Sequence, residues 1–358
     1  MHFADVIIAG KLPKKDQTAK LLADKGSRAK WWRRRGTPKK GYSYITFDGK
    51  NVTDEASLER IRSLVIPPAW RYVRISPAAG GKLQAVGVDT TGRLQYIYHP
   101  KFAEKQQRLK FARIEKFGEH MPQLRRITNE HISLDGFPKE KVLAIMTRLI
   151  NSLYIRMGTD HSVKTYRTYG ITTLGKKHVN IGAKGRVVFE FVGKSRIKHR
   201  KVIVDPELAS LLKDLVKLGR GSKLFKYYDE TQKLRPVKPS EINGYIKSIT
   251  APEFTAKDFR TWGATLLAAV RLAELGVCED ERQMKKNIVQ AVKMVAEDLG
   301  NTPAVCRSSY IHPSILKAYS NGLVLSSFTP QRMRLAKRIE LEFEPEEVAL
   351  LELFKQFH

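Results

Sequence analysis

The N-terminal part of the chain alternates apolar and polar positions in short runs, a pattern typical of β-strands. Residues 42–47 alternate aromatic and polar side chains and end at Asp48-Gly49, a dipeptide favoured in hairpin turns. Residues 58–64 have the spacing of a short helix. Further strands are predicted at residues 72–75, 83–88 and 94–98. Together these runs predict a small antiparallel sheet.

From about residue 101 the apolar positions recur with the period of a helix. One predicted helix buries a single face, made by Val142, Ile145, Met146, Leu149 and Leu153. The same period recurs at residues 208–215, 288–299 and 345–354. Gly300 directly follows the second of these segments, where a glycine typically ends a helix. This part of the chain is therefore predicted to be mostly helical.

One hairpin interrupts the helical part. Residues 178–181 and 187–192 have strand patterns, and a turn with two glycines at residues 182–185 joins them. The predicted fold class is therefore α+β. A small N-terminal antiparallel β domain, residues 1–105, is expected to precede a larger and mostly α-helical domain with a β-hairpin, residues 106–358.

The charge of the chain narrows the choice of partner. Its 358 residues include 65 Lys and Arg against 36 Asp and Glu, a formal net charge of +29. Such a surplus favours nucleic acid or an anionic membrane surface. The apolar run at residues 6–9 is too short for a signal peptide or a membrane span. Cys278 and Cys306 show no disulfide framework or metal-site spacing. We therefore expect a cytoplasmic protein that acts on nucleic acid.

A basic segment lies near the N-terminus. The first fifty residues hold 13 Lys or Arg and four Asp. In this segment Trp31 and Trp32 are followed directly by Arg33, Arg34 and Arg35. Guanidinium groups beside aromatic rings can bind phosphates and sugars. A basic arm that an aromatic residue anchors on the fold explains the pattern equally well, and the two interpretations are compatible.

Motifs for nucleotide and metal chemistry are missing from the sequence. Residues 219–223 contain glycine and lysine, but without the spacing of a nucleotide-binding loop, and no zinc pattern occurs. The acidic run at residues 279–281 is typical of a solvated helix face. We therefore expect neither a nucleotide cofactor nor a metal. Phosphoryl transfer without a metal needs a nucleophile such as tyrosine, fixed cations, and an acid for the leaving oxygen.

Four segments supply such groups. They are residues 154–158 with Arg156, 191–194 with Lys194, 255–263 with Arg260, and 299–313 with Tyr310. In this order the segments resemble the catalytic motifs of type IB DNA topoisomerases of the poxvirus-like and bacterial branch. Residues 66–70, 84–89 and 92–100 also resemble the bacterial members, so the resemblance covers roughly residues 28–335.

The resemblance implies a role for each group. Arg156 and Arg260 would hold the scissile phosphate. Lys194 would protonate the leaving 5′ oxygen, and Tyr310 would form a 3′-phosphotyrosyl intermediate. The free 5′ end would rotate, which relaxes positive and negative supercoils, and would then be rejoined without ATP. The resemblance also implies a monomer, associated with the nucleoid, whose two domains form a clamp around double-stranded DNA.

Two positions depart from the pattern of the family. Asn301 stands where the poxvirus enzymes have a histidine, nine residues before the tyrosine. Its amide can donate a hydrogen bond to a phosphate oxygen but cannot carry charge. Ser162 stands where the family usually has an aromatic residue, although Tyr166 and Tyr169 follow. This loop contacts DNA in the family, so the departure concerns target-site preference.

Candidate DNA contacts come from both predicted domains. Tyr96 and Tyr98 share one strand face and are candidates for the core, whereas Gln95 lies on the opposite face. The residues expected to contact DNA are Arg33, Arg34, Arg35, Gln84, Arg93, Gln95, Lys164, Tyr166 and Lys257.

Two other functions fit part of the pattern. A tyrosine recombinase would share the two arginines, the lysine and the tyrosine. Its second arginine motif normally reads His-x-x-Arg, however, and this chain has Lys257-Asp258-Phe259-Arg260. Recombinases also usually begin with a helical domain, whereas this chain begins with strands. A non-enzymatic DNA-coating protein would account for the charge alone, and it predicts no covalent complex with DNA.

Overall fold

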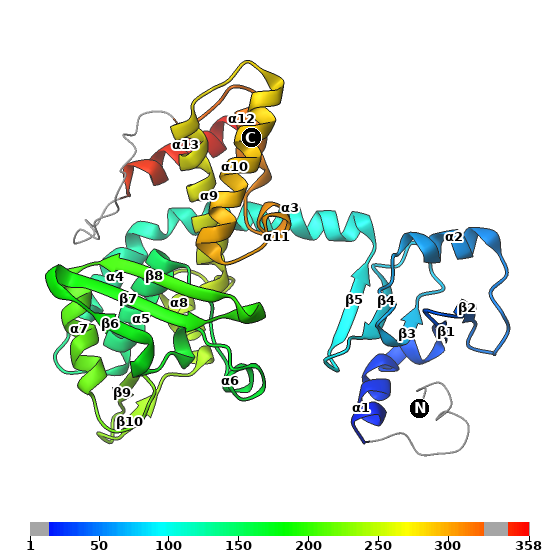
Figure 1. Ribbon diagram of the computed structural model, residues 1–358, viewed down its shortest axis with the longest axis horizontal. Helices are drawn as coiled ribbons and strands as arrows, with labels where there is room; N and C mark the ends of the chain where they lie inside the picture. The colour runs from blue at the N-terminus through cyan, green and yellow to red at the C-terminus, as the bar shows by residue number, and fades with distance from the viewer. Residues whose placement is uncertain (1–13, 326–342, 358) are drawn as a thin grey trace. The chain divides into compact units, whose positions relative to one another are not determined.

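The computed structural model describes residues 14–325 and 343–357. The apolar run at residues 6–9 lies outside these ranges. The chain divides into two compact units, of which the first ends at Lys110 and the second begins at Phe111 (Figure 1). Helix α3 (Pro100–Glu119) starts in the first unit and ends in the second. The combination of helices and antiparallel sheets makes this an α+β protein.

The first unit is built on a five-stranded antiparallel sheet in the order β2-β1-β3-β4-β5. The predicted strands and the short helix are all present. The elements are α1 (Lys14–Ala23), a 3-10 turn (Gly26–Lys30), β1 (Trp32–Thr37), β2 (Gly41–Ile45), α2 (Glu55–Ser63), β3 (Arg71–Ile75), β4 (Leu83–Val88) and β5 (Leu94–Tyr98).

Strand β1 replaces the expected basic arm. It lies inside the sheet, with Trp32 opposite Ile75 of β3 and Arg33 opposite Ile45 of β2. Trp32 packs against the core of this unit, which consists of Ile61, Val73, Ile75 and Ala85. Because arginines occupy both faces of β1, the apolar alternation that marks a strand is missing from its sequence.

The second unit is mostly helical. It also holds a three-stranded antiparallel sheet, β6-β7-β8, and the small β9-β10 hairpin. Its helices after α3 are α4 (Met121–Ile132), α5 (Lys139–Leu153), α6 (Asp160–Tyr166), α7 (Pro206–Lys217), α8 (Pro239–Ile249), α9 (Ala256–Leu275), α10 (Glu281–Leu299), α11 (Pro303–Ser309), α12 (Pro313–Ser320) and α13 (Pro345–Phe357). Its strands are β6 (Val179–Ile181), β7 (Arg186–Val192), β8 (Lys198–Val204), β9 (Lys226–Tyr228) and β10 (Leu234–Pro236). Short 3-10 turns occur at Ile171–Thr173, Lys176–His178, Ala183–Gly185 and Lys194–Arg196.

Two helices form the centre of the second unit. The predicted apolar face of α5 is buried, since Val142, Ile145, Met146 and Leu149 are all fully enclosed. Helix α9 is buried along most of its length and contacts α5, α8, α10, α12 and α13. Close packing fixes it further, because Trp262 lies directly against Gly118 of α3. Helix α9 is therefore a rigid support for any side chain that it directs into a site.

The C-terminal helix α13 packs against the rest of the second unit. Glu347 of α13 is buried and forms an ion pair with Arg125 of α4 (2.6 Å), where each side chain is only 4% exposed. Phe354 packs against the ring of His312 at a centroid distance of 4.8 Å. Helix α13 is thus docked on the unit through one ion pair and an apolar face.

The packing of α3 against α9 leads to a stability prediction. A Cβ at Gly118 would overlap the Trp262 ring, so Gly118→Ala should lower the free energy of unfolding by about 1–3 kcal/mol. Gly244 is exposed on α8, and a Cβ there would meet no atom. Gly244→Ala should therefore raise the free energy of unfolding by up to about 1 kcal/mol. Chemical denaturation measures both changes, and a Gly118→Ala variant as stable as the wild type would contradict this packing.

Candidate active site

Arg156 lies just beyond the end of α5. At Tyr154 the backbone adopts a left-handed conformation (φ 53°) that ends the helix. The ring of Tyr154 packs against α9 at Gly263, where a Cβ would overlap the ring. Arg156 then reaches the end of α10, where its guanidinium donates to the Gly300 carbonyl (3.3 and 3.4 Å) and to Oδ1 of Asn301. The first candidate arginine is therefore fixed by contacts with two helix ends.

Arg260 projects from α9 into the interior and is only 4% exposed. Its guanidinium donates to the carbonyls of Tyr154 and Leu299, the latter at 2.9 Å. Burial, and after it the charge of Arg156, lower the pKa of Arg260 to about 10. The group therefore keeps its charge at neutral pH. The two carbonyls replace part of its lost hydration, while the buried Nε has no hydrogen-bond partner among the described residues.

The start of α9 is held in place by its own N-terminal turn. Thr255 and Asp258 form a capping box. Asp258 is almost completely buried and also forms an ion pair with Arg113 of α3 (2.6 Å). These contacts fix the rotation of the helix, and hence the direction of Arg260. Lys257 lies in the same turn and is exposed.

Asn301 follows the end of α10, where Gly300 caps the helix in a left-handed conformation (φ 59°), as predicted. Because Oδ1 of Asn301 accepts from Arg156, the orientation of the amide is determined. The Nδ2 group is buried and has no acceptor among the described residues. A buried donor without a partner costs about 1–3 kcal/mol. Nδ2 is thus a hydrogen-bond donor that a bound anion beside Arg156 can satisfy.

Tyr310 ends the short helix α11 and lies next to Arg260. The guanidinium carbon of Arg260 is 5.3 Å from the centroid of the Tyr310 ring. Burial alone would raise the pKa of Tyr310. The charge and hydrogen bond of Arg260, together with Arg156 and Lys257, outweigh burial and lower that pKa below its ordinary value. The cations of the site therefore favour the phenolate, which is the nucleophilic form.

His312 anchors the chain just after Tyr310. Its Nε2 lies 3.1 Å from a carboxylate oxygen of Glu115, and its Nδ1 accepts from the backbone N–H of Ser314. The backbone N–H of His312 donates to Oγ1 of Thr265 on α9, which is also within hydrogen-bond distance of the Tyr310 carbonyl (3.2 Å). The backbone of the candidate nucleophile is thereby tied to the helix that carries the second arginine.

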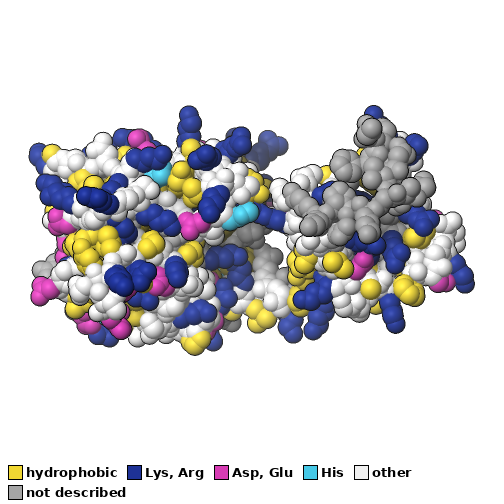
Figure 2. Space-filling model, turned by 90° about the horizontal axis from the view of Figure 1, so that it is seen from below, with side chains coloured by type: hydrophobic (Ala, Val, Ile, Leu, Met, Phe, Trp, Pro, Cys, Tyr) yellow, Lys and Arg dark blue, Asp and Glu magenta, His cyan; other side chains and the backbone are white. Residues whose placement is uncertain are grey.

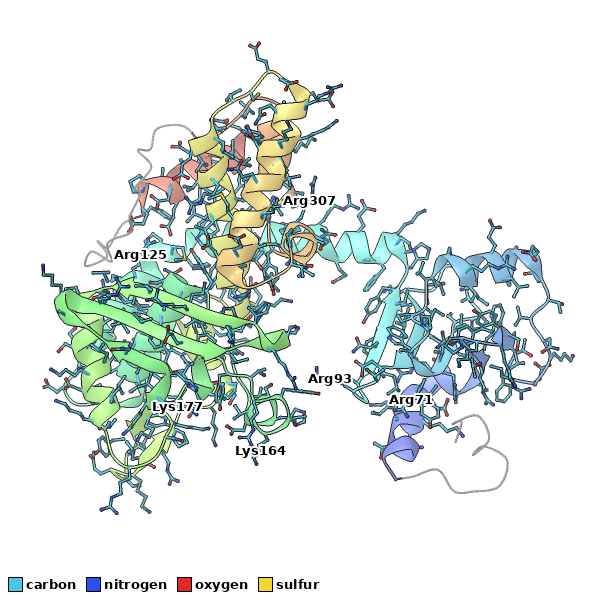
Figure 3. The ribbon with its side chains drawn as sticks, viewed as in Figure 1. Arg71, Arg93, Arg125, Lys164, Lys177 and Arg307 are labelled. Atoms are coloured by element: carbon cyan, nitrogen blue, oxygen red, sulfur yellow. The ribbon has the colours of Figure 1, made fainter. Side chains whose placement is uncertain are left out.

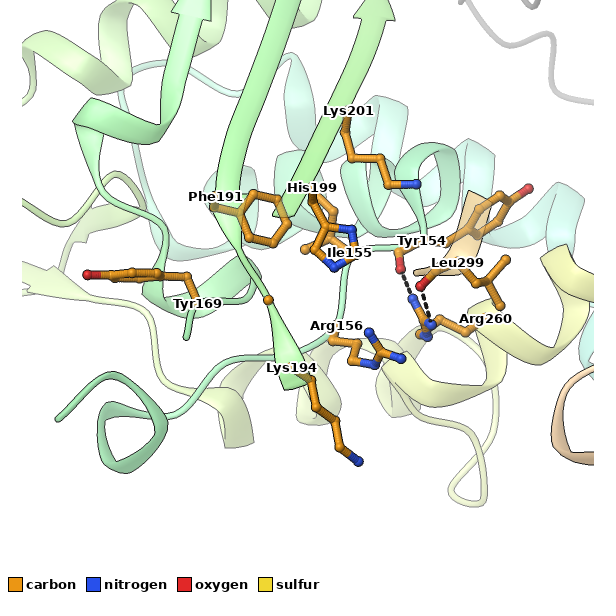
Figure 4. Close-up of a pocket in the computed structure, with 11 residues that line it drawn as sticks. Tyr154, Ile155, Arg156, Tyr169, Phe191, Lys194, His199, Lys201, Arg260 and Leu299 are labelled. Atoms are coloured by element: carbon orange, nitrogen blue, oxygen red, sulfur yellow. Dashed lines mark hydrogen bonds between the residues drawn. The ribbon is translucent and has the colours of Figure 1, made fainter. Parts of the chain in front are cut away.

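Lys194 stands at the tip of the turn that joins β7 and β8. The turn is tight, with Ser195 and Arg196 both in left-handed conformations (φ 63° and 60°). Lys194 itself is exposed, and its side chain extends outward from the hairpin tip (Figure 4). Its position directly after a strand agrees with the sequence prediction. The turn gives this cation more freedom than the two arginines have.

A pocket brings the three candidate cations together (Figure 4). Its lining residues are Tyr154, Ile155, Arg156, Tyr169, Phe191, Gly193, Lys194, His199, Lys201, Arg260 and Leu299. Sequence reasoning missed His199 and Lys201. Both lie on β8, two positions apart, and therefore share one face of the strand. Predicting β8 as a strand would have placed both side chains on the same face as each other, just after the turn that carries Lys194. Lys201 donates to the carbonyl of Asp298, and burial lowers its pKa.

The structure corrects two of the expected DNA contacts. Gln84 is 1% exposed; its amide group donates to backbone carbonyls of residues 78, 79 and 81, and its Oε1 accepts from Arg60 (2.7 Å). Arg34 is half-buried, lies over the Tyr42 ring, and donates to the carbonyls of Pro68 and Trp70, among others. Both side chains serve the fold, because their polar atoms are used within the first unit.

The other expected contacts of the first unit differ in exposure. Arg35 and Arg93 are exposed, and Arg33 is half-buried on β1. Gln95 is half-buried and donates to Asp89 (2.8 Å). The prediction that Tyr96 and Tyr98 belong to the core is wrong. Their side chains are 46% and 45% exposed and stack on each other, with ring centroids 6.2 Å apart.

The loop after Arg156 forms the short helix α6. Ser162 helps to begin this helix, since its N–H donates to the Oγ1 of Thr159. Lys164 is exposed and points outward from the helix (Figure 3). Tyr166 is half-buried against the ring of His161, at a centroid distance of 6.2 Å. The Ser162 hydroxyl also lies 2.8 Å from Oγ1 of Thr159, so this side chain takes part in the local structure of the loop.

The surface of the second unit is strongly basic. Lys and Arg side chains are spread over most of the face seen in Figure 2. Among the described residues, His, Cys, Asp and Glu side chains form no group of three or more that could hold a metal ion. Within the same part of the chain, every helix is too short or too polar to cross a membrane.

Family models match two segments of the chain. The catalytic core of eukaryotic DNA topoisomerase I matches residues 99–337, which include all the candidate catalytic residues. The N-terminal domain of bacterial DNA topoisomerase IB matches residues 41–89, which include strands β2 to β4.

Curated relatives agree with these matches. The chain is 31% identical to DNA topoisomerase 1B of Acanthamoeba polyphaga mimivirus over 288 residues, which is 78% of this chain and 85% of that protein. It is 25% identical to DNA topoisomerase 1B of vaccinia virus, strain Copenhagen, over 66% of this chain and 72% of that protein. It is also 28% identical to DNA topoisomerase 1 of Daucus carota over 45% of this chain and 20% of that protein. The chain therefore belongs to the type IB DNA topoisomerase family.

Proposed function

We propose that Tyr310 is the nucleophile of this topoisomerase and that Arg156, Arg260 and Lys194 act on the phosphate it attacks. The observation that carries the proposal is the arrangement around Arg260. This buried guanidinium lies beside the Tyr310 ring and shares one pocket with the other two cations. Tyr310 does not itself line the pocket, but a phosphodiester held by Arg260 would lie against the same guanidinium that the Tyr310 ring contacts, so the phenolate and the positive charges would be brought together. This is the arrangement that attack on phosphorus requires.

The proposed reaction conserves the energy of the phosphodiester bond. The phenolate oxygen of Tyr310 attacks phosphorus and forms the 3′-phosphotyrosyl bond, while the bond from phosphorus to the 5′ oxygen breaks. The departing electron pair stays on the 5′ oxygen, which takes a proton from Nζ of Lys194. After rotation the 5′ hydroxyl returns this proton, attacks phosphorus and releases Tyr310. Because bond energy is stored in the intermediate, the enzyme needs no ATP to relax positive or negative supercoils.

Cations of the chain itself would stabilise the transition state. Arg156 and Arg260 present guanidinium groups that can bind phosphate oxygens in pairs. Nδ2 of Asn301 would donate to a non-bridging oxygen, which supplies the acceptor that this buried amide lacks. We propose on this basis that the reaction needs no metal ion.

We further propose how the rest of the chain takes part. Residues 1–105 would form a DNA-binding domain and residues 106–358 the catalytic domain, and together the two would form a clamp around the duplex. The exposed or half-buried candidates would contact DNA: Arg33, Arg35, Arg93, Gln95, Lys164, Tyr166 and Lys257. We propose a nucleoid-associated enzyme that acts as a monomer, because one chain carries every catalytic group named here.

Replacing the nucleophile tests the proposal directly. Tyr310→Phe should slow relaxation of a supercoiled plasmid by at least about 10⁴-fold, because the phenolate is lost while the packing remains. Tyr228 is 38% exposed on β9, and Tyr228→Phe is the matched control that should relax DNA as the wild type does. The assay contains EDTA and no ATP, uses plasmids of both supercoil signs, and includes trapping of a covalent adduct at the 3′ end. An active Tyr310→Phe enzyme would overturn the assignment.

The pH dependence of cleavage tests the role of the surrounding cations. Cleavage should speed up with rising pH as Tyr310 loses its proton. Lys257 is one of the cations that lower the pKa of Tyr310, so Lys257→Met should raise that pKa and move the midpoint of the profile to higher pH. The variant should be slower than the wild type at neutral pH and approach it in alkaline buffer. Lys286→Met removes an exposed cation on α10 and should leave the midpoint unchanged. Single-turnover cleavage measures the profiles, and a midpoint that Lys257→Met does not move would refute this role.

A further inference from the structure

His199 lines the pocket but has no part in the proposed reaction. It lies on β8, and its ring stacks on Phe191 of β7 at a centroid distance of 5.1 Å and an angle of 26° (Figure 4). The imidazole is half-buried. The contacts of this ring with the surrounding backbone indicate what it does.

Two glycines enclose the His199 ring. A Cβ added to Gly193 would lie 2.5 Å from Cδ2 and Nε2 of the ring. A Cβ added to Gly300 would overlap Cε1 of the same ring. The imidazole therefore rests against bare backbone at both positions, and a larger residue at either one would displace it.

Each glycine adjoins a candidate catalytic group. Gly193 directly precedes Lys194, at the tip of the β7-β8 hairpin. Gly300 directly precedes Asn301, and its carbonyl accepts from Arg156. The ring of His199 thus fills the space between the hairpin that carries the exposed lysine and the helix end that orients the first arginine.

We propose that His199 is a positioning residue, a flat spacer that sets the distance from Lys194 to the phosphate bound by Arg156. Lys194 is exposed, and the turn that carries it is closed by its own backbone hydrogen bonds, so the position of Lys194 depends on where the hairpin tip as a whole lies. The ring of His199 supports the tip through the backbone of Gly193. It acts through Lys194 and takes no proton itself.

The charge state of the ring agrees with a spacer. Burial, followed by the nearby charges of Lys201, Arg156 and Arg260, lowers the pKa of His199 to about 4. The ring is therefore neutral at physiological pH. A neutral group can stand among these cations without adding repulsion, whereas a lysine or arginine at this position would add a further positive charge.

The inference rests on the proposed role of Lys194 as the general acid, so the test must separate the two. A substrate in which sulfur replaces the bridging 5′ oxygen has a leaving group of much lower pKa, which needs no proton from an acid. Lys194→Ala should cleave the oxygen-linked DNA at least about 100-fold more slowly than the wild type and the sulfur-linked DNA nearly as fast. If Lys194→Ala is equally slow on both substrates, the proposed role of Lys194 fails, whatever His199 does.

Given that result for Lys194, two variants decide the role of His199. His199→Ala removes the spacer and should slow cleavage of oxygen-linked DNA by about 10–100-fold, while sulfur-linked DNA is cleaved within about threefold of the wild-type rate. His199→Phe keeps a flat neutral ring and should stay within a few-fold of the wild type on both substrates. Arg200→Ala, on the opposite face of β8, is the control and should match the wild type.

Each contrary result has a definite meaning. A His199→Ala variant that is equally slow on both substrates would overturn the inference, because the ring would then support the phosphate site or the fold rather than Lys194. A His199→Phe variant as slow as His199→Ala would also overturn it, since a ring nitrogen would then be required. Thermal unfolding of each variant shows whether it is folded. If His199→Ala does not fold, the rates of His199→Phe on the two substrates still decide whether a flat neutral ring is sufficient.

Discussion

The candidate active site depends on one constraint, which is that a charged guanidinium must be kept almost out of water. Arg260 is 4% exposed, and it is held by carbonyl groups at the ends of two helices, Tyr154 after α5 and Leu299 at the end of α10. Carbonyl groups at a helix C-terminus lack partners within the helix and carry partial negative charge. They accept hydrogen bonds from Nη1 and Nη2 of Arg260 without neutralising its charge, whereas its Nε has no partner among the described residues. Any change that moved either helix end would remove one of the two acceptors of this buried cation.

Other features of the second unit follow from this constraint. Gly263 allows the Tyr154 ring to lie against α9, which brings the Tyr154 carbonyl to Arg260. Gly300 ends α10 so that its carbonyl faces Arg156. Thr265, which lies on α9, connects that helix by hydrogen bonds to the backbone around Tyr310. Close packing at these glycines thus fixes the positions of Arg156 and Arg260, whereas Lys194 lies exposed on its turn.

The sequence predicted those features of the fold that depend on residues close together along the chain. The apolar face of α5 and the cap at Gly300 depend on spacing within one helix, so both were predictable. Strands β1 and β8 were missed because arginine and lysine occupy positions where alternation would reveal a strand. Gln84 was misassigned because its partners are backbone carbonyls, which a sequence does not display. The contact between Arg156 and Asn301 joins positions far apart in the chain, and only the fold brings them together.

The acceptors of the enclosed or half-buried arginines separate those that pair with carboxylates from the two that we propose bind phosphate. Arg125 pairs with Glu347, and Arg148 with Asp205 and Glu207, so each of these charges is neutralised within the fold. Arg156 and Arg260 donate instead to carbonyl and amide oxygens. A carboxylate at either position would cancel the positive charge and compete with a phosphate for the same donors. Neutral acceptors stabilise the guanidinium groups and leave their charge available to an anion. This choice of acceptors explains how a stably folded unit can keep two uncompensated positive charges in one pocket.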